Sequence, residues 1–121
     1  EQKMGFFTRF IQKKEKSGMD FSSIKSNEAA KELCEQNVLA PLYIVPLRFG
    51  GEDICNNILY VPPEVVDLKN RYDAVVEKIL QKEPSLRYVC TPEYKGKSFV
   101  PSVLHISVTG KTRFSQKIQI W

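Results

Sequence analysis

The spacing of apolar and polar positions changes several times along this 121-residue chain, and each change predicts an element. Between residues 64 and 82, apolar side chains recur every three to four positions, which is the spacing of one face of a helix. The two prolines just before this stretch favour the first turn of a helix. The apolar face predicted for this helix consists of Val65, Leu68, Tyr72, Val75, Val76, Ile79 and Leu80. Further along, Leu104, Ile106 and Val108 alternate with His105 and Ser107, as in a strand buried on one face.

The other elements follow from the same criteria, with glycines, prolines and polar clusters as boundaries. Helices are predicted over 5–16 and 28–36, the second with Ser26 or Asn27 as its N-cap, and strands over 41–49, 58–61, 86–91, 99–108 and 112–121. This order predicts an α+β fold with a single antiparallel sheet of about five strands, a long helix packed on one face and N-terminal helices. We expect residues 1–25 to form a basic amphipathic segment and linker, and residues 26–121 to form a single α+β domain.

The net charge of +4 is concentrated near the N-terminus. Five basic residues against Glu15 supply the whole excess, namely Lys3, Arg9, Lys13, Lys14 and Lys16. A sequence-specific nucleic-acid binder carries its basic stripe on the folded body, so we do not expect that function. The same segment has the composition of a short helix lying on an anionic membrane surface, a weak contact that would use Phe6, Phe7, Phe10, Lys13 and Lys14.

The cysteines and the single histidine argue against a metal or disulfide framework. Cys34, Cys55 and Cys90 are odd in number and widely spaced, without a CxxC pair, which is typical of a reduced, cytoplasmic protein. A structural zinc site needs about four nitrogen or sulfur ligands, which would require all three cysteines and His105. We therefore predict no metal, no cofactor and no catalytic residue, and we place His105 on the outer face of the sheet.

Two polar connections are the best candidates for a binding surface, because loops at the surface commonly carry function. The first contains Gly50, Gly51, Glu52, Asp53, Asn56 and Asn57, and the second contains Tyr94, Lys95 and Lys97. The glycines allow unusual backbone angles, and tyrosine is enriched at protein interfaces. Both loops are predicted to contact a partner protein.

Parts of the chain are similar to a group of uncharacterised small cytosolic bacterial proteins. The similar residues are 46–53, Asn57, 60–62, 94–99 and 120–121, within a region that covers roughly 40–121. Some members of this group resemble immunity proteins of toxin–immunity loci, so the resemblance implies stoichiometric binding of a partner and transfers no functional residue. We therefore predict a non-enzymatic cytosolic protein-binding module, of which an immunity protein that occludes a toxin domain is one kind. The alternatives are a peripheral membrane-associated protein anchored by its N-terminal helix, and a small ligand-binding domain or enzyme whose site is assembled only on folding.

Overall fold

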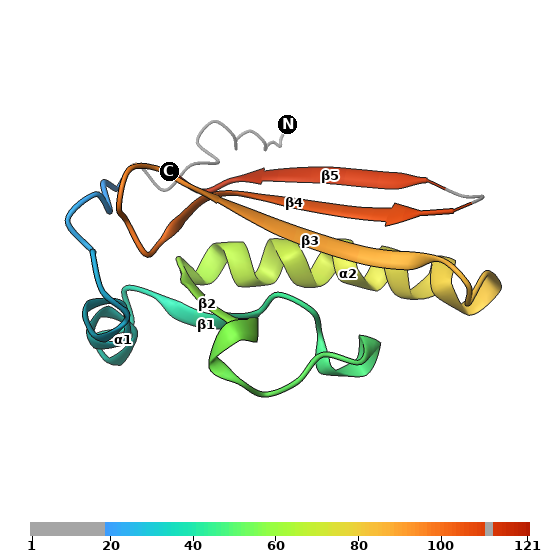
Figure 1. Ribbon diagram of the computed structural model, residues 1–121, viewed down its shortest axis with the longest axis horizontal. Helices are drawn as coiled ribbons and strands as arrows, with labels where there is room; N and C mark the ends of the chain where they lie inside the picture. The colour runs from blue at the N-terminus through green and yellow to red at the C-terminus, as the bar shows by residue number, and fades with distance from the viewer. Residues whose placement is uncertain (1–18, 111–112) are drawn as a thin grey trace.

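The computed structural model describes residues 19–110 and 113–121 as two helices, five strands and two short 3₁₀ helices (Figure 1). In chain order they are α1 (Asn27–Glu35), β1 (Ala40–Tyr43), η1 (Leu47–Phe49), η2 (Cys55–Asn57), β2 (Ile58–Val61), α2 (Pro63–Lys82), β3 (Arg87–Tyr94), β4 (Pro101–Thr109) and β5 (Phe114–Gln119). The helix predicted over 5–16 and its membrane-facing residues, Phe6, Phe7, Phe10, Lys13 and Lys14, lie outside the described residues.

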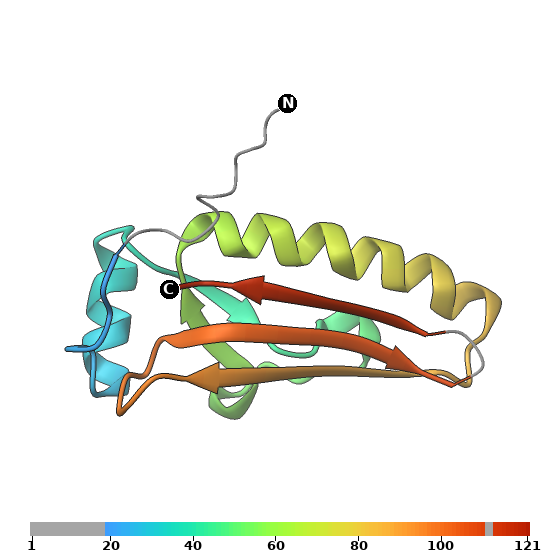
Figure 2. The ribbon, with the colours of Figure 1, turned by 90° about the horizontal axis from the view of Figure 1, so that it is seen from above.

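The α+β class is confirmed, but the prediction of a single five-stranded sheet is wrong. The strands form two antiparallel sheets, a hairpin of β1 and β2 and a three-stranded meander in the order β3-β4-β5. Figures 1 and 2 show α2 and the hairpin side by side beneath the meander, with α1 at one end. Contacts of α2 with β5 and of β2 with β4 join the two layers. The hairpin thus packs against a face of the meander instead of extending its edge.

Proline explains why the first predicted strand is shorter than expected. The pattern predicted a strand over 41–49, whereas β1 ends at Tyr43 and η1 follows from Leu47. Pro46 has no backbone N–H to donate to a ladder, and its carbonyl accepts hydrogen bonds from Phe49 and Gly51 instead. A strand of four residues that itself contains Pro41 is a poor template for a larger sheet.

The core lies between the two layers and follows the predicted alternation in β4. Leu104, Ile106 and Val108 are buried, whereas His105 on the opposite face is partly exposed. Residues from both layers complete the main apolar cluster, which includes Leu39, Leu42, Leu59, Val61, Val65, Val100, Ile118 and Ile120. The pattern therefore identified the inner face of the meander correctly.

The start of α1 shows the predicted cap. Ser26 has an extended backbone, and its Oγ accepts a hydrogen bond from the Ala29 N–H at 3.1 Å. After the helix, Asn37 adopts a positive φ of 63°, a left-handed conformation common just beyond helix ends. This turn lets the chain reverse into β1, because the N–H groups of Val38 and Leu39 both donate to the carbonyl of Leu33.

The stretch before α1, predicted to be part of a linker, contributes a core side chain. Phe21 is 1% exposed, and its ring meets the edge of Trp121 at a centroid distance of 5.9 Å. The Phe21 carbonyl accepts a hydrogen bond from Ser98 Oγ at 2.8 Å, and the Ile24 carbonyl accepts one from the Phe99 N–H at 2.7 Å. Phe21 and Ile24 thus hold the stretch before α1 against the end of the meander.

Candidate functional site

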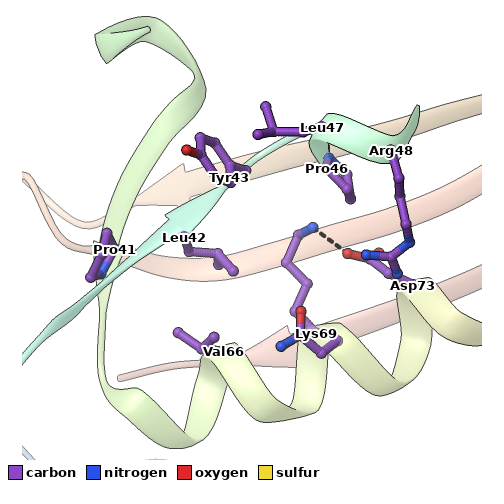
Figure 3. Close-up of a pocket in the computed structure, with 10 residues that line it drawn as sticks. Pro41, Leu42, Tyr43, Pro46, Leu47, Arg48, Val66, Lys69 and Asp73 are labelled. Atoms are coloured by element: carbon purple, nitrogen blue, oxygen red, sulfur yellow. Dashed lines mark hydrogen bonds and ion pairs between the residues drawn. The ribbon is translucent and has the colours of Figure 1, made fainter. Parts of the chain in front are cut away.

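A pocket of about 310 Å³ opens between β1, η1 and α2 (Figure 3). Its walls are mostly apolar, and its polar side chains come from α2, from η1 and from Tyr43 of β1. The lining residues are Pro41, Leu42, Tyr43, Pro46, Leu47, Arg48, Val66, Lys69, Asn70 and Asp73. Small-molecule sites have this character, with apolar walls and a few placed polar groups, and this volume is at the lower end of their range of about 300–1,000 Å³.

The polar groups of the pocket include two charged side chains on the buried face of α2. Lys69 and Asp73 follow Val65 at intervals of four residues, so they project from the same side of the helix as Val65 and Val76. Each is only 1% exposed. The predicted apolar stripe therefore has a charged centre, while Val75, assigned to that stripe, is 45% exposed.

Lys69, Asp73 and Tyr88 form a closed hydrogen-bonded cluster. Lys69 Nζ donates to Asp73 Oδ2 at 2.6 Å and to Tyr88 Oη at 2.9 Å. The Tyr88 hydroxyl in turn donates to Asp73 Oδ1 at 2.7 Å, and the Ile44 carbonyl lies 3.5 Å from the same hydroxyl oxygen. Both oxygens of the Asp73 carboxylate are thus occupied. A buried ion pair requires hydrogen-bond partners for its polar atoms in this way, because removing the two charges from water is costly.

The surroundings of the cluster keep Tyr88 protonated. Burial raises the pKa of Tyr88 far above its usual value, and the adjacent charge of Asp73 raises it further. The tyrosine therefore acts as a neutral hydroxyl that donates to the carboxylate. Burial likewise raises the pKa of the Cys90 thiol, while Cys55 is exposed in η2.

Arg48 stands between this pocket and a second, neighbouring hollow of about 430 Å³. Its Nε lies 3.3 Å from Glu77 Oε1, and its guanidinium lies 5.0 Å from the centre of the Phe49 ring. The Phe49 ring meets Tyr88 at 5.1 Å, which ties η1 to the buried cluster. Because both side chains of the Arg48–Glu77 pair are nearly half exposed, water screens their charges and the pair contributes little to stability.

The predicted glycine loop follows η1, and none of its six residues lines the pocket. Its residues have separate roles. Gly50 has φ 97°, and a Cβ on Gly51 would lie 1.9 Å from the Val45 carbonyl oxygen, so both positions favour glycine for different reasons. Asp53 accepts a hydrogen bond from the Tyr43 hydroxyl at 2.9 Å, which raises the pKa of Tyr43.

Two asparagines and an acid complete this loop. Asn57 is part of the framework, because its side chain bonds the main chain of Val45 and of Glu52. Glu52 and Asn56 have exposed side chains. The loop thus combines a rigid frame with exposed polar groups.

The second predicted loop lies elsewhere. Tyr94, Lys95 and Lys97 belong to the end of β3 and its connection to β4, at the level of the meander. The glycine loop belongs to the layer beneath the meander, beside α2 (Figures 1 and 2). Tyr94 is 46% exposed, and Lys95 Nζ lies 4.6 Å from the centre of the Trp121 ring. The nine predicted contact residues are therefore divided between two regions.

His105 lies on the outer face of the meander, as the alternation predicted. Its Nε2 is paired with the Glu93 carboxylate on β3; the His105 side chain is partly exposed and the Glu93 side chain is exposed. The possibility of an enzyme depended on a deep pocket that joins His105 to Glu52 or Asp53, and His105 instead pairs with Glu93. The pocket described above does not include it.

Comparisons with protein families, with curated proteins and with solved structures found no match to this chain. The resemblance to immunity proteins therefore stays a prediction. Among the described residues, no His, Cys, Asp or Glu side chains gather in threes or more around a position for a metal ion. Within the same part of the chain, no helix combines the length and apolar character needed to span a membrane.

Proposed function

We propose that the protein is a binding module that holds a partner protein through the loop between β1 and β2 and the adjoining pocket. The observation that carries the proposal is that two large apolar side chains, Leu47 and Ile54, are 49% and 48% exposed on this loop. The loop is also held in one conformation by the side chain of Asn57. Exposed apolar side chains beside a hollow are typical of interaction surfaces.

A preformed loop favours binding because little conformational entropy is lost when the partner arrives. A standard interface would bury on the order of 800 Å² on this protein, an area that the loop, the pocket rim and the neighbouring face of α2 would together supply. Glu52 is exposed on the same loop and would speed encounter with a basic partner more than it would tighten the complex. Occlusion of a toxin domain by an immunity protein is one form that this activity would take.

Site-specific photo-crosslinking in the native host tests the proposal. A photoreactive phenylalanine analogue would replace Leu47 or Ile54 in the full-length protein, and Val89 would be the matched control position. Val89 is also a large exposed apolar residue, 40% exposed, but it lies in β3 of the meander. A partner-binding loop should give a discrete protein adduct of the same mass from positions 47 and 54.

The control at position 89 shows whether an adduct is specific to the loop. Position 89 should give no adduct of that mass, and a Leu47→Asp change should remove the adduct formed at position 54. Equal labelling from all three positions, or no adduct from 47 and 54, would contradict binding through this loop.

A further inference from the structure

The second hollow, of about 430 Å³, is an apolar site whose charges are balanced. It lies between η1, the last turns of α2 and the chain that leads into β3. Two of its lining residues, Arg48 and Glu77, are charged, and they are paired with each other at 3.3 Å. Its apolar walls are formed by Phe49, Leu80, Pro84, Leu86 and Tyr88. A hollow of this volume and character has room for an uncharged apolar group.

The apolar walls are the outer side of a small core cluster. The cluster consists of the buried residues Val76, Leu86 and Val108, with Phe49, Leu80 and Tyr88 partly buried against it. Because core packing holds these side chains, the hollow is already formed before a partner arrives. Little conformational entropy would therefore be lost when it is filled.

Two aromatic rings and a guanidinium meet at one side of the hollow. The rings of Phe49 and Tyr88 have centroids 5.1 Å apart and planes at 60° to each other. The Arg48 guanidinium carbon lies 5.0 Å from the centre of the Phe49 ring. Aromatic rings favour edge-to-face and offset contacts with one another, and a guanidinium is attracted to the face of a ring. A third ring placed here would gain both kinds of contact, which an aliphatic side chain would not.

The hollow lies next to the exposed Leu47 of the proposed binding loop. Leu47, Arg48 and Phe49 are consecutive in η1, so a projecting apolar side chain and one wall of the hollow belong to the same turn. Figure 3 shows the Leu47 side chain directed away from α2 and the Arg48 side chain extended towards it. Interfaces draw most of their binding energy from a few large side chains, often Trp or Tyr, that fill pockets of the other protein.

We propose that this hollow receives an aromatic side chain of the partner protein, which packs against Phe49 and Tyr88 beside the Arg48 guanidinium. The inference rests on the proposed function and adds the chemical class of the group that the partner contributes. Leu47 would contact the surface of the partner while the partner's ring fills the hollow on the other side of the same turn.

An NMR titration with four blocked amino acids tests this inference on the full-length, ¹⁵N-labelled protein. The probes are the N-acetyl amides of tryptophan, tyrosine, phenylalanine and leucine, which are uncharged and differ only in the side chain. We expect the three aromatic amides at millimolar concentration to shift the backbone amide resonances of Phe49, Gln81 and Leu86. The leucine amide should bind at least about threefold more weakly.

Two results of this titration would overturn the inference. Equal binding of the leucine amide would contradict the selection of an aromatic group. Aromatic amides that leave the resonances of Phe49, Gln81 and Leu86 unshifted would show that the hollow is not their site.

Two variants test the walls of the hollow. Leu80→Gln places an amide of similar size in the wall and should weaken binding of all three aromatic amides at least about threefold. Arg48→Met removes only the guanidinium and should reduce the preference for aromatic amides over the leucine amide. Arg71→Met is the matched control, because Arg71 is an exposed base of α2 that does not line the hollow, and it should change neither quantity.

The two variants fail in different ways. Arg48 is nearly half exposed, so Arg48→Met leaves the core intact and decides the question even if Leu80→Gln does not fold. An unchanged aromatic preference in Arg48→Met would overturn the role of the guanidinium. Unchanged binding in a folded Leu80→Gln protein would overturn the hollow as the site.

Photo-crosslinking at position 85 tests whether the ring belongs to the partner protein. Ser85 is exposed and lies between Pro84 and Leu86, which both line the hollow. A photoreactive phenylalanine analogue there should give the same adduct as positions 47 and 54. Binding of aromatic amides without an adduct from position 85 would overturn the assignment to the partner. Adducts from 47 and 54 alone, with no binding of aromatic amides, would remove the aromatic group and leave the proposed function in place.

Discussion

Asn57 holds the main chain of Val45 at both of its polar groups. Its Oδ1 accepts a hydrogen bond from the Val45 N–H and its Nδ2 donates to the Val45 carbonyl, each at 2.9 Å. A third bond of 2.9 Å joins Nδ2 to the Glu52 carbonyl. The side chain thus continues the ladder of the hairpin beyond the end of β1 and fixes the loop that carries Leu47 and Ile54.

Replacement of Asn57 by alanine should destabilise the protein by about 1–3 kcal/mol, because partly buried backbone groups lose their partners. Urea unfolding followed by circular dichroism measures the change. The neighbouring Asn56→Ala is the matched control, since the Asn56 side chain is exposed, and it should change stability by less than about 0.5 kcal/mol. Equal effects of the two changes would show that the Asn57 bonds do not hold the loop.

Alanine at Gly51 should destabilise more than alanine at Gly50, although of these two glycines only Gly50 has a positive φ. A Cβ at position 51 would overlap the Val45 carbonyl oxygen at 1.9 Å, and such overpacking against backbone costs about 1–3 kcal/mol or more. At position 50 a Cβ meets open space, so the cost is the strain of the left-handed backbone, about 1–2 kcal/mol. Thermal unfolding of both variants gives the order, and the reverse order would contradict the close approach of Gly51 to the Val45 carbonyl.

The buried pair of Lys69 and Asp73 should show strong coupling in a double-mutant cycle. Lys69→Met or Asp73→Leu alone leaves one buried charge without its partner and should cost about 3–5 kcal/mol. The double change removes both charges from the apolar surroundings and should be less destabilising than either single change. Denaturant unfolding of the four proteins provides the cycle. Additive losses would mean that the two charges act independently.

Tyr88 should make the protein less stable in alkaline solution. Burial raises the pKa of Tyr88 above the value of about 10 in an unfolded chain, so above that pH the unfolded chain releases a proton that the folded protein retains. Stability therefore falls as pH rises above about 10, by up to about 1.4 kcal/mol per pH unit from this group. Tyr88→Phe should lower stability near neutral pH, through its lost hydrogen bonds, yet give a shallower decline above pH 10. Unfolding curves at several pH values test this, and parallel declines for the two proteins would contradict it.

Much of the fold could be predicted because local patterns coincide with it. The strand at Ile58–Val61 has the bounds that the pattern gave, and α2 starts at Pro63, within one residue of its predicted start. What the pattern could not give is the division into two sheets. Whether a hairpin extends a sheet or packs under it depends on contacts such as that of β2 with β4, which are distant in sequence.

The candidate site was only partly visible in the sequence. The glycine loop is a turn held by hydrogen bonds of the Asn57 side chain, and its role as a contact surface stays a prediction. Lys69 and Asp73 were missed because their charges suggested a solvated position on α2, although they follow Val65 at intervals of four residues. The sequence did contain a signal for this pair: a base and an acid four residues apart fall on the same side of the helix as the apolar residues. Tyr88 gave no such signal, since its partners lie 15 and 19 residues away.

The edge contact of Phe21 with Trp121 has a practical consequence for anyone who wishes to shorten the protein. A version that lacks the basic N-terminal residues keeps this ring contact only if it begins no later than Phe21. A cut at residue 26 would remove the Phe21 ring from the core and the acceptors used by Ser98 and Phe99. Loss of membrane or partner binding in such a shortened protein would then report a damaged domain instead of a missing tail.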